Sequence, residues 1–181
     1  DRVSASNTWF RDELPDTGFA PGRVTVLPPQ PKSKAYLASS MRLDIPALNV
    51  NTSIVTVPFK DGTWDVTWLG SEAGYLEGSA YPTWSGNTVL TAHESSEYDQ
   101  PGPFAYLNKL SYGDLIKIHA FGMTYTYEVR SSYLVSPDNF SLVFQEEAYD
   151  WVSLLTCEGY DAESDDYLYR RLIRAVLVSV H

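Results

Sequence analysis

The residue with the clearest capacity for chemistry is Cys157, the only cysteine in the 181-residue sequence. A cysteine becomes a nucleophile when a neighbouring group stabilises its thiolate or accepts its proton. Taken alone, a single cysteine is more readily explained as a small buried hydrophobic residue. A catalytic interpretation therefore depends on the residues that the fold brings beside Cys157.

His93 is the strongest candidate for a proton acceptor among the three histidines. It ends a predicted buried strand, where side chains project over the rim of a barrel, and the polar residues 94–97 follow it. His119 lies within an alternating strand, so we expect it to be structural or exposed. His181 is the last residue and carries no signal.

Three arginines could supply the positive charge that an acyl-transfer site needs for its oxyanion. Arg170, Arg171 and Arg174 lie on the predicted strand that follows Cys157. A hairpin would place that strand antiparallel beside the cysteine strand. Alternation would then put Arg170 and Arg174 on one face and Arg171 on the other.

The elements that must position these residues are mostly short strands. An apolar run at residues 151–155, followed closely by turn-forming residues, predicts a buried strand that delivers Cys157 to the mouth of the fold. We expect residues 70–86 to be loop, 104–110 to be helical and 136–150 to form a long connection. The other predicted strands are residues 42–45, 53–57, 64–69, 87–92, 115–120, 123–135 and 169–180. About eight strands with little helix predict an all-β, closed or nearly closed barrel.

Composition favours one globular domain and excludes some partners. Hydrophobic residues make up 44% of the chain, charged residues only 20%, and the net charge is −10. A chain this acidic lacks the positive surface that nucleic acid binding requires, and an anionic membrane surface would repel the chain. The acidic loop at residues 158–166 lacks the spacing of an EF-hand loop, so we expect it to be solvated and predict no metal and no cofactor.

Residues 1–40 differ from the rest and form a predicted first region, with a single domain over residues 41–181. Proline and glycine are frequent there and periodicity is poor, which predicts an extended arm. The arm contains the pentapeptide Leu14, Pro15, Asp16, Thr17 and Gly18.

Several motifs together resemble the sortase family. The segments Thr91-Ala92-His93 and Gly102-Pro103-Phe104 are similar to the sortase histidine region. Residues 153–157, Ser-Leu-Leu-Thr-Cys, resemble the sortase Thr-Leu-x-Thr-Cys motif with serine in the first position. Arg170 follows the cysteine at a spacing that a sortase catalytic arginine can have. The resemblance covers roughly residues 41–180.

This resemblance implies an eight-stranded sortase barrel with a few short helices and a cysteine transpeptidase activity. It is closer to class D and E sortases than to the pilin polymerases. Cys157 would be the nucleophile, His93 the general acid and base, and Arg170 the group that binds the oxyanion and the substrate carbonyl. Arg171 would be an alternative to Arg170, and Thr156 would shape the substrate pocket through its hydroxyl.

The implied substrates are surface proteins with a Leu-Pro-x-Thr-Gly or Leu-Ala-x-Thr-Gly sorting signal. Cys157 would attack the Thr–Gly carbonyl, and the thioacyl enzyme would pass to an amine of a cell-wall precursor or a pilin-type lysine. The resemblance also implies a location on the extracellular face of the bacterial cell membrane, with a membrane anchor upstream of the present sequence.

The arm itself matches this sorting signal at residues 14–18. A proline-rich segment follows it instead of an apolar span and a basic tail, so it is not a conventional anchoring signal. We hypothesise that it occupies a sortase groove, its own or a neighbour's, as a pseudosubstrate. Self-cleavage between Thr17 and Gly18 is the second possibility.

Two alternatives to a transpeptidase stay open. The chain could be a thiol protease of the same fold that releases its product to water, or a catalytically silent barrel that holds sorting-signal peptides. The joint presence of Cys157, His93 and Arg170 favours an enzyme, because a silent copy need not keep all three.

Overall fold

A computed structural model describes residues 40–96 and 100–181. The predicted arm, with its pentapeptide at residues 14–18, lies outside the described residues. The boundary between arm and domain therefore stays a prediction, although the first described strand begins at Met41.

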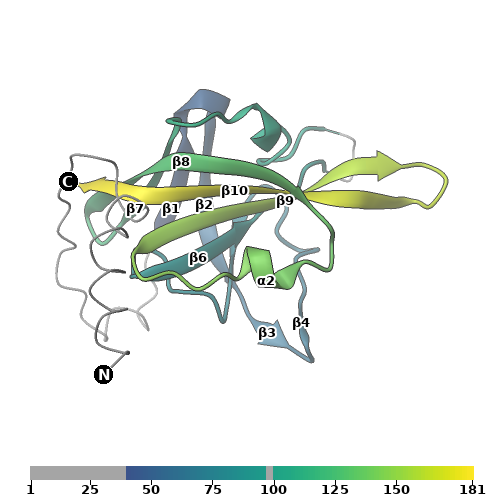
Figure 1. Cartoon of the computed structure of the whole chain (residues 1–181), viewed down its shortest axis with the longest axis horizontal. Coiled ribbons are helices and arrows are strands. Elements are labelled where there is room, and N and C mark those ends of the chain that lie inside the picture. The colour runs from purple at the N-terminus through teal and green to yellow at the C-terminus, as the bar shows by residue number, and fades with distance from the viewer. Residues whose placement is uncertain (1–39, 97–99) are drawn as a thin grey trace, which may run out of the picture.

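Eight strands close into a barrel in the order β1-β2-β5-β6-β9-β10-β8-β7 (Figure 1). Their bounds are β1 Met41–Ile45, β2 Val50–Val57, β5 Ala73–Leu76, β6 Gly86–Thr91, β7 Leu115–Ala120, β8 Met123–Val135, β9 Asp150–Asp161 and β10 Asp166–Val180. A small separate hairpin is made by β3 (Phe59–Lys60) and β4 (Thr63–Trp64), and the described helices are η2 (Pro46–Leu48), η3 (Leu107–Lys109) and α2 (Phe140–Val143). The predicted all-β fold with an eight-stranded barrel is confirmed.

Alternation along β9 and β10 divides their side chains between two hydrophobic clusters. Val152, Leu154 and Ile173 belong to the main core inside the barrel. Leu155 and Leu172, on the opposite face, pack in a second cluster on the outer surface. That outer cluster is covered by the connection between β8 and β9, residues 136–149, which contains α2 (Figure 1).

The predicted strand at residues 64–69 is wrong beyond its first residue. The Asp65 carboxylate accepts hydrogen bonds from the Thr67 amide (3.0 Å) and hydroxyl (2.6 Å), which closes a turn. The Leu69 amide also donates to the Val66 carbonyl at 3.2 Å, so the chain turns again. An aspartate that bonds the backbone two residues on competes with strand pairing, and here this local bond prevails over the alternating pattern.

The predicted loop at residues 70–86 contains a barrel strand, β5, which pairs in parallel with β2 and antiparallel with β6. It is only four residues long, and all four are buried. A Cβ atom at Gly74 would lie 2.5 Å from a methyl carbon of Val57, so glycine allows close packing here. A short buried strand with a central glycine lacks the pattern that identifies longer strands.

The predicted helix at residues 104–110 is reduced to turns and the single 3₁₀ turn η3. Phe104, Leu107 and Leu110 are all buried, at a spacing of three residues. A spacing of three places side chains above one another in a 3₁₀ turn, so the apolar pattern was real but the helix type differed.

Strands β9 and β10 continue past the barrel and form a projecting hairpin, at the right of Figure 1. Most of the predicted acidic loop is therefore strand, and only residues 162–165 form the turn. The Tyr167 hydroxyl of this hairpin donates to a carboxylate oxygen of Glu94 at 2.9 Å. The hairpin is thus tied to the loop that follows His93.

Candidate active site

The pairing of β9 with β10 sets Cys157 directly opposite Arg170. Opposed residues in an antiparallel pair project from the same face of the sheet. Arg171 is opposite Thr156 and faces the other way. The side-chain faces that alternation predicted for these arginines are therefore confirmed.

His93 follows β6, which runs parallel to β9 with Thr91 paired to Leu155. His93 and Cys157 are each two residues beyond this pair, and both line the same cavity. The Thr156 hydroxyl, which is buried, donates to the backbone carbonyl of Ala92 at 2.9 Å. This bond ties the residue before the histidine to the residue before the cysteine.

Gly102 holds the His93 segment from its other side. The Phe104 amide donates to the His93 carbonyl at 3.1 Å, and the Gly102 amide donates to the Glu94 carbonyl at 2.7 Å. A Cβ atom at Gly102 would lie 2.3 Å from the His93 carbonyl oxygen, closer than real Cβ contacts come. A glycine is therefore needed for this backbone to approach the histidine.

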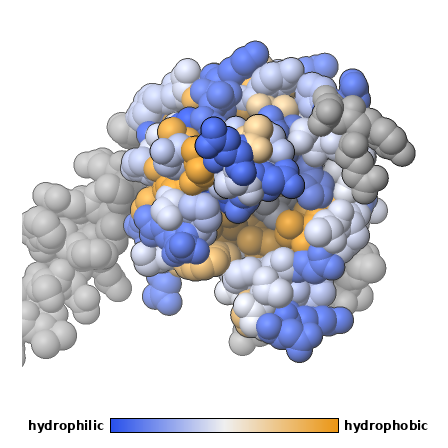
Figure 2. All heavy atoms as spheres, turned by 90° about the vertical axis from the view of Figure 1, so that its right-hand side faces the viewer, coloured by the Kyte–Doolittle hydropathy of each residue, from blue (hydrophilic) through white to orange (hydrophobic). Residues whose placement is uncertain are grey.

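Cys157, His93 and Arg170 share one cavity of about 280 Å³, called here the apolar cavity. Its walls come from residues 63–76, from the β8–β9 connection and from the outer face of β9. Hydrophobic side chains predominate in it, among them Trp64, Leu69, Phe140, Val143, Phe144 and Leu155. The molecule is hollowed at this end, and Figure 2 shows hydrophobic residues within the hollow. Such a cavity suits an apolar peptide segment that ends at the reactive groups.

Burial raises the pKa of the Cys157 thiol above its ordinary value. The positive charge of Arg170 opposes this shift, whereas Glu94 and Asp166 add to it. The thiol is therefore protonated at neutral pH in the resting protein, and a base must remove its proton when it attacks.

Arg171 is engaged elsewhere and does not line the apolar cavity. Its guanidinium donates to both carboxylate oxygens of Glu158, at 2.7 Å and 2.6 Å. It also contacts the Ser132 hydroxyl at 3.3 Å. Of the two adjacent arginines, the structure brings Arg170 and not Arg171 to the cysteine.

Comparison with known proteins gives the family. The Sortase domain model matches residues 43–178. The chain belongs to the sortase family. Three solved structures illustrate the likeness. Sortase A from Corynebacterium diphtheriae is 27% identical with a TM-score of 0.65, over 77% of this chain and 60% of that chain. Sortase C-1 from Actinomyces oris is 26% identical with a TM-score of 0.62, over 76% and 72%.

A Clostridium perfringens Sortase D5 transpeptidase shares the fold at 22% identity, with a TM-score of 0.60 over 77% of this chain and 79% of that chain. The search of curated proteins found no match. The similar structures thus include classes A, C and D, and the class of this sortase stays a prediction. The chain spans 60% of the length of the Corynebacterium diphtheriae structure that it matches.

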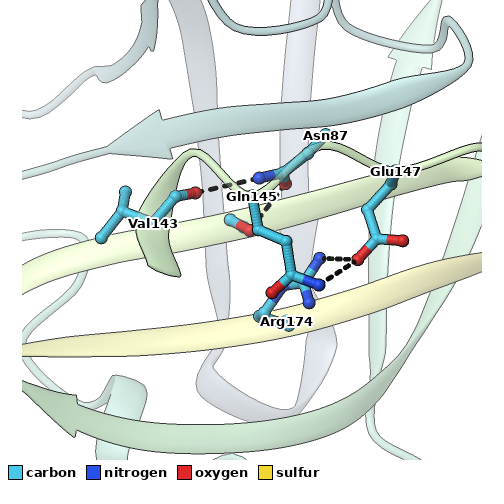
Figure 3. A network of polar contacts seen from close by, with 6 residues as sticks. Asn87, Val143, Gln145, Glu147 and Arg174 are labelled. Carbon is cyan, nitrogen blue, oxygen red and sulfur yellow. Dashed lines mark hydrogen bonds and ion pairs between the residues drawn. The ribbon is translucent and has the colours of Figure 1, made fainter. Parts of the chain in front are cut away.

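A polar network that the sequence did not reveal fastens the β8–β9 connection of this sortase to the barrel (Figure 3). Arg174 is buried on β10, donates to Glu147 at 2.6 Å and lies over the Trp151 ring, 4.7 Å from its centroid. Gln145 donates to the same Glu147 oxygen at 3.0 Å. The face of Arg174 was predictable, but its partner lies in a connection without periodicity.

Asn87 on β6 adds a second fastening to the same connection. Its amide donates to the Val143 carbonyl at 2.9 Å, and its oxygen accepts from the Ser153 hydroxyl at 2.7 Å (Figure 3). Val143 lines the apolar cavity, so this network holds one wall of the site.

Residues 40–96 and 100–181 of this sortase contain no group of three His, Cys, Asp or Glu side chains that could hold a metal ion. This part of the chain also contains no helix of the length and apolarity that a membrane crossing requires.

Proposed function

We propose that this sortase is a cysteine transpeptidase that cleaves a Leu-Pro-x-Thr-Gly-like sorting signal between threonine and glycine. The observation that carries the proposal is the apolar cavity, which has Cys157, His93 and Arg170 among its lining residues. The hydrophobic part would bind the apolar residues of the signal. The three polar residues would act on the Thr–Gly bond.

Acylation begins with transfer of the Cys157 proton to His93, because burial keeps the thiol protonated at rest. The thiolate attacks the threonine carbonyl, a C–S bond forms, and the guanidinium of Arg170 stabilises the negative oxygen. His93 then gives its proton to the leaving glycine amine as the C–N bond breaks. Thr156 supports these steps by fixing the histidine segment through Ala92.

The acyl group then passes to an amine of a cell-wall precursor or a pilin-type lysine, as expected for the family. The donors would be surface proteins that carry the sorting signal. The reaction would take place at the extracellular face of the bacterial cell membrane.

The arm would regulate the enzyme through its own signal-like residues 14–18. About twenty residues separate them from the barrel, enough to span roughly 66–72 Å when extended. A tethered peptide can reach an effective concentration of the order of millimolar, so weak binding would suffice. The alternative outcome is self-cleavage between Thr17 and Gly18.

One experiment separates the candidate functions. The protein is mixed with a Leu-Pro-x-Thr-Gly or Leu-Ala-x-Thr-Gly peptide and an amine acceptor, and products are identified by mass. Ligated product supports the transpeptidase, hydrolysed product alone supports the protease, and intact peptide after removal of the arm supports the silent barrel. Cys157→Ala is the control that must abolish both products.

The arm is tested separately. An incubated sample that gains a fragment ending at Thr17, absent in Cys157→Ala, would establish self-cleavage. Deletion of residues 1–22 should raise the peptide cleavage rate if the arm is a pseudosubstrate. An unchanged rate would end the autoinhibition hypothesis.

A further inference from the structure

Strand β8 has one edge without a neighbouring strand near the active site. Its pairing with β7 ends at Glu128, and the Val129 backbone then exchanges two hydrogen bonds of 2.9 Å with the turn before β7. On the opposite edge, the pairing with β10 continues to Val135. Among the described residues, residues 130–135 therefore have a backbone partner on one edge only. Their other edge is called here the free β8 edge.

The free β8 edge lacks the side chains that usually keep the edge of a sheet from pairing. Natural edges are protected by charged side chains or proline. Residues 131–135 read Ser-Ser-Tyr-Leu-Val, and Tyr133 and Leu134 are 44% and 50% exposed. The nearest irregularity in the pairing with β10 lies at Arg130, ahead of this run. The free β8 edge is therefore suited to accept another strand.

One segment of the arm fits this edge. Residues 23–27 read Arg-Val-Thr-Val-Leu and contain the only three consecutive β-branched residues of the arm. Such residues favour strands. A glycine precedes the run and a proline follows it, so its five residues match the length of the uncharged run on β8. This segment lies outside the described residues.

We propose that residues 23–27 add to the free β8 edge of the same molecule as an antiparallel strand, and that this pairing directs residues 14–18 into the apolar cavity. Main-chain hydrogen bonds supply the affinity in strand addition of this kind. The pairing is independent of the proposed function, whereas its effect on activity rests on the proposed regulation by the arm. In the central register, residue 27 lies opposite Ser131 and residue 23 opposite Val135.

The connection from the added strand to β1 favours the antiparallel direction. Pairing through β7 places Met41 level with Met123, eight residues before Ser131 on β8. The added strand would continue the line of β7, so this connection must span about 28 Å, and residues 28–40 reach up to about 43–47 Å. A parallel strand would begin the connection at Val135 and need about 41 Å, which is close to full extension of a proline-rich segment.

The other end of the added strand leads to the active site. Val135, Arg170 and Cys157 pair in one row across three neighbouring strands. Arg23 in the same row would lie three strand spacings, about 14–15 Å, from Cys157, and the five residues from Arg23 to Gly18 reach up to about 17–18 Å. The two residues after Val135 line the apolar cavity on this side. The bond that precedes Gly18 can therefore reach the thiol, whereas a parallel strand would lead it away.

Hydrogen exchange measured by mass spectrometry tests the pairing in the 181-residue chain. Proline at both Val24 and Thr25 removes two successive amides, one of which must face β8 in a strand. If about nine of ten molecules are paired, this change should speed the exchange of outward-facing amides in residues 131–135 by about tenfold. The control places proline at both Ser4 and Ala5, in the same arm but outside the segment, and should leave exchange unchanged. Equal exchange in the wild-type protein and the Val24→Pro, Thr25→Pro variant would overturn the inference.

Protein concentration distinguishes pairing within one molecule from pairing between molecules. Protection of residues 131–135 should stay constant over about a hundredfold range of concentration, because a tethered strand is always present at the same effective concentration. Protection that grows with concentration, with a dimer in light scattering, would overturn the inference. The free β8 edge would then bind a second copy or the arm of that copy.

Deletion of residues 1–22 separates the pairing from the proposed function. This variant keeps residues 23–27, so residues 131–135 should stay protected, while the donor peptide is cleaved faster because the signal-like residues are gone. The Val24→Pro, Thr25→Pro variant should lose the protection and also cleave faster. Loss of protection without a change in rate would support the pairing and refute regulation by the arm. Absence of donor cleavage by every form would overturn the proposed function alone, because exchange reports the pairing without catalysis.

Discussion

Replacement of Glu147 by alanine should destabilise one wall of the apolar cavity and affect substrate binding more than the chemical step. The change removes the carboxylate that accepts from Arg174 and Gln145 on the β8–β9 connection. Arg174 would remain buried on β10, and its Nε already has no hydrogen-bond partner among the described residues. The variant therefore leaves a buried cation that keeps its contact with the Trp151 ring but has lost its carboxylate partner.

The size of the effect follows from burial. The side chains of Arg174 and Glu147 are 8% and 14% exposed, so solvent screens their contact little. A hydrogen bond to a charged group contributes about 1.5–3 kcal/mol, and removal of one partner leaves the other desolvated. We expect Glu147→Ala to lower the free energy of unfolding by about 2–3 kcal/mol, which corresponds to a fall in Tm of about 4–12 °C for a chain of this size.

Two further variants locate the cause. Glu147→Gln keeps the acceptor oxygen and should cost only about 1 kcal/mol. Arg174→Met combined with Glu147→Ala removes the uncompensated cation and should recover much of the loss, because apolar replacement of a buried pair is often neutral. Chemical unfolding monitored by tryptophan fluorescence measures all three variants.

The functional consequence is a rise in the KM of the donor peptide that exceeds any fall in kcat, because the connection supplies Phe140, Val143 and Phe144 to the cavity. Glu128→Ala is the matched control. It breaks a partly buried ion pair with Arg130 on β8, and neither residue lines the cavity. If Glu147→Ala changed KM no more than Glu128→Ala at similar stability, the network would not position the wall.

Three other outcomes are expected. The rate of Cys157 alkylation by iodoacetamide should rise with pH, with an apparent pKa above that of free cysteine. In Arg170→Gln this apparent pKa should be higher still, because the positive charge of Arg170 opposes the upward shift. An apparent pKa below that of free cysteine would refute the burial argument. Gly102→Ala should destabilise the fold by about 1–3 kcal/mol and lower kcat, since its Cβ would meet the His93 carbonyl; unfolding and steady-state kinetics measure both, and a variant with wild-type kinetics would contradict it. Burial raises the pKa of Asp150 well above its ordinary value, so the folded state binds its proton more tightly and loses stability as pH rises from the unfolded pKa through the folded one. Asp150→Asn should flatten the fall of Tm with pH that begins above the unfolded-state carboxyl pKa of about 4. An unchanged slope would exclude Asp150 as the source of that fall.

The part of the site that could be predicted from sequence obeys local rules. Cys157 and Arg170 lie within one hairpin, and alternation along two paired strands fixes which side chains share a face. To predict which residues of β9 and β10 lie opposite one another, only the pairing of these two strands is then needed. For this reason Arg170 and Arg174 could be assigned to one face and Arg171 to the other, whereas the choice of Arg170 over Arg171 needed the pairing of Arg170 with Cys157.

The parts that could not be predicted depend on contacts distant in sequence. Strand β5 is held by parallel pairing to β2 and by the space that Gly74 leaves, neither of which shows as a periodic pattern. The Arg174–Glu147 contact joins a strand to an aperiodic connection 27 residues away. The bond that ties the β9–β10 hairpin to the loop after His93 joins Glu94 and Tyr167, which are 73 residues apart.

The position of Cys157 along β9 explains why the thiol is partly buried and still lines a cavity. Residues 150–154 are buried, whereas residues 158–161 are partly or fully exposed on the projecting hairpin. Cys157 lies at the transition, where β9 stops being barrel wall and becomes the free hairpin. Burial there raises the thiol pKa, so the group is protected by its proton until a base and a substrate are present. Leu155, two residues deeper on the same face, is a hydrophobic part of the wall of the apolar cavity, whereas Gly159, two residues further along, no longer lines it.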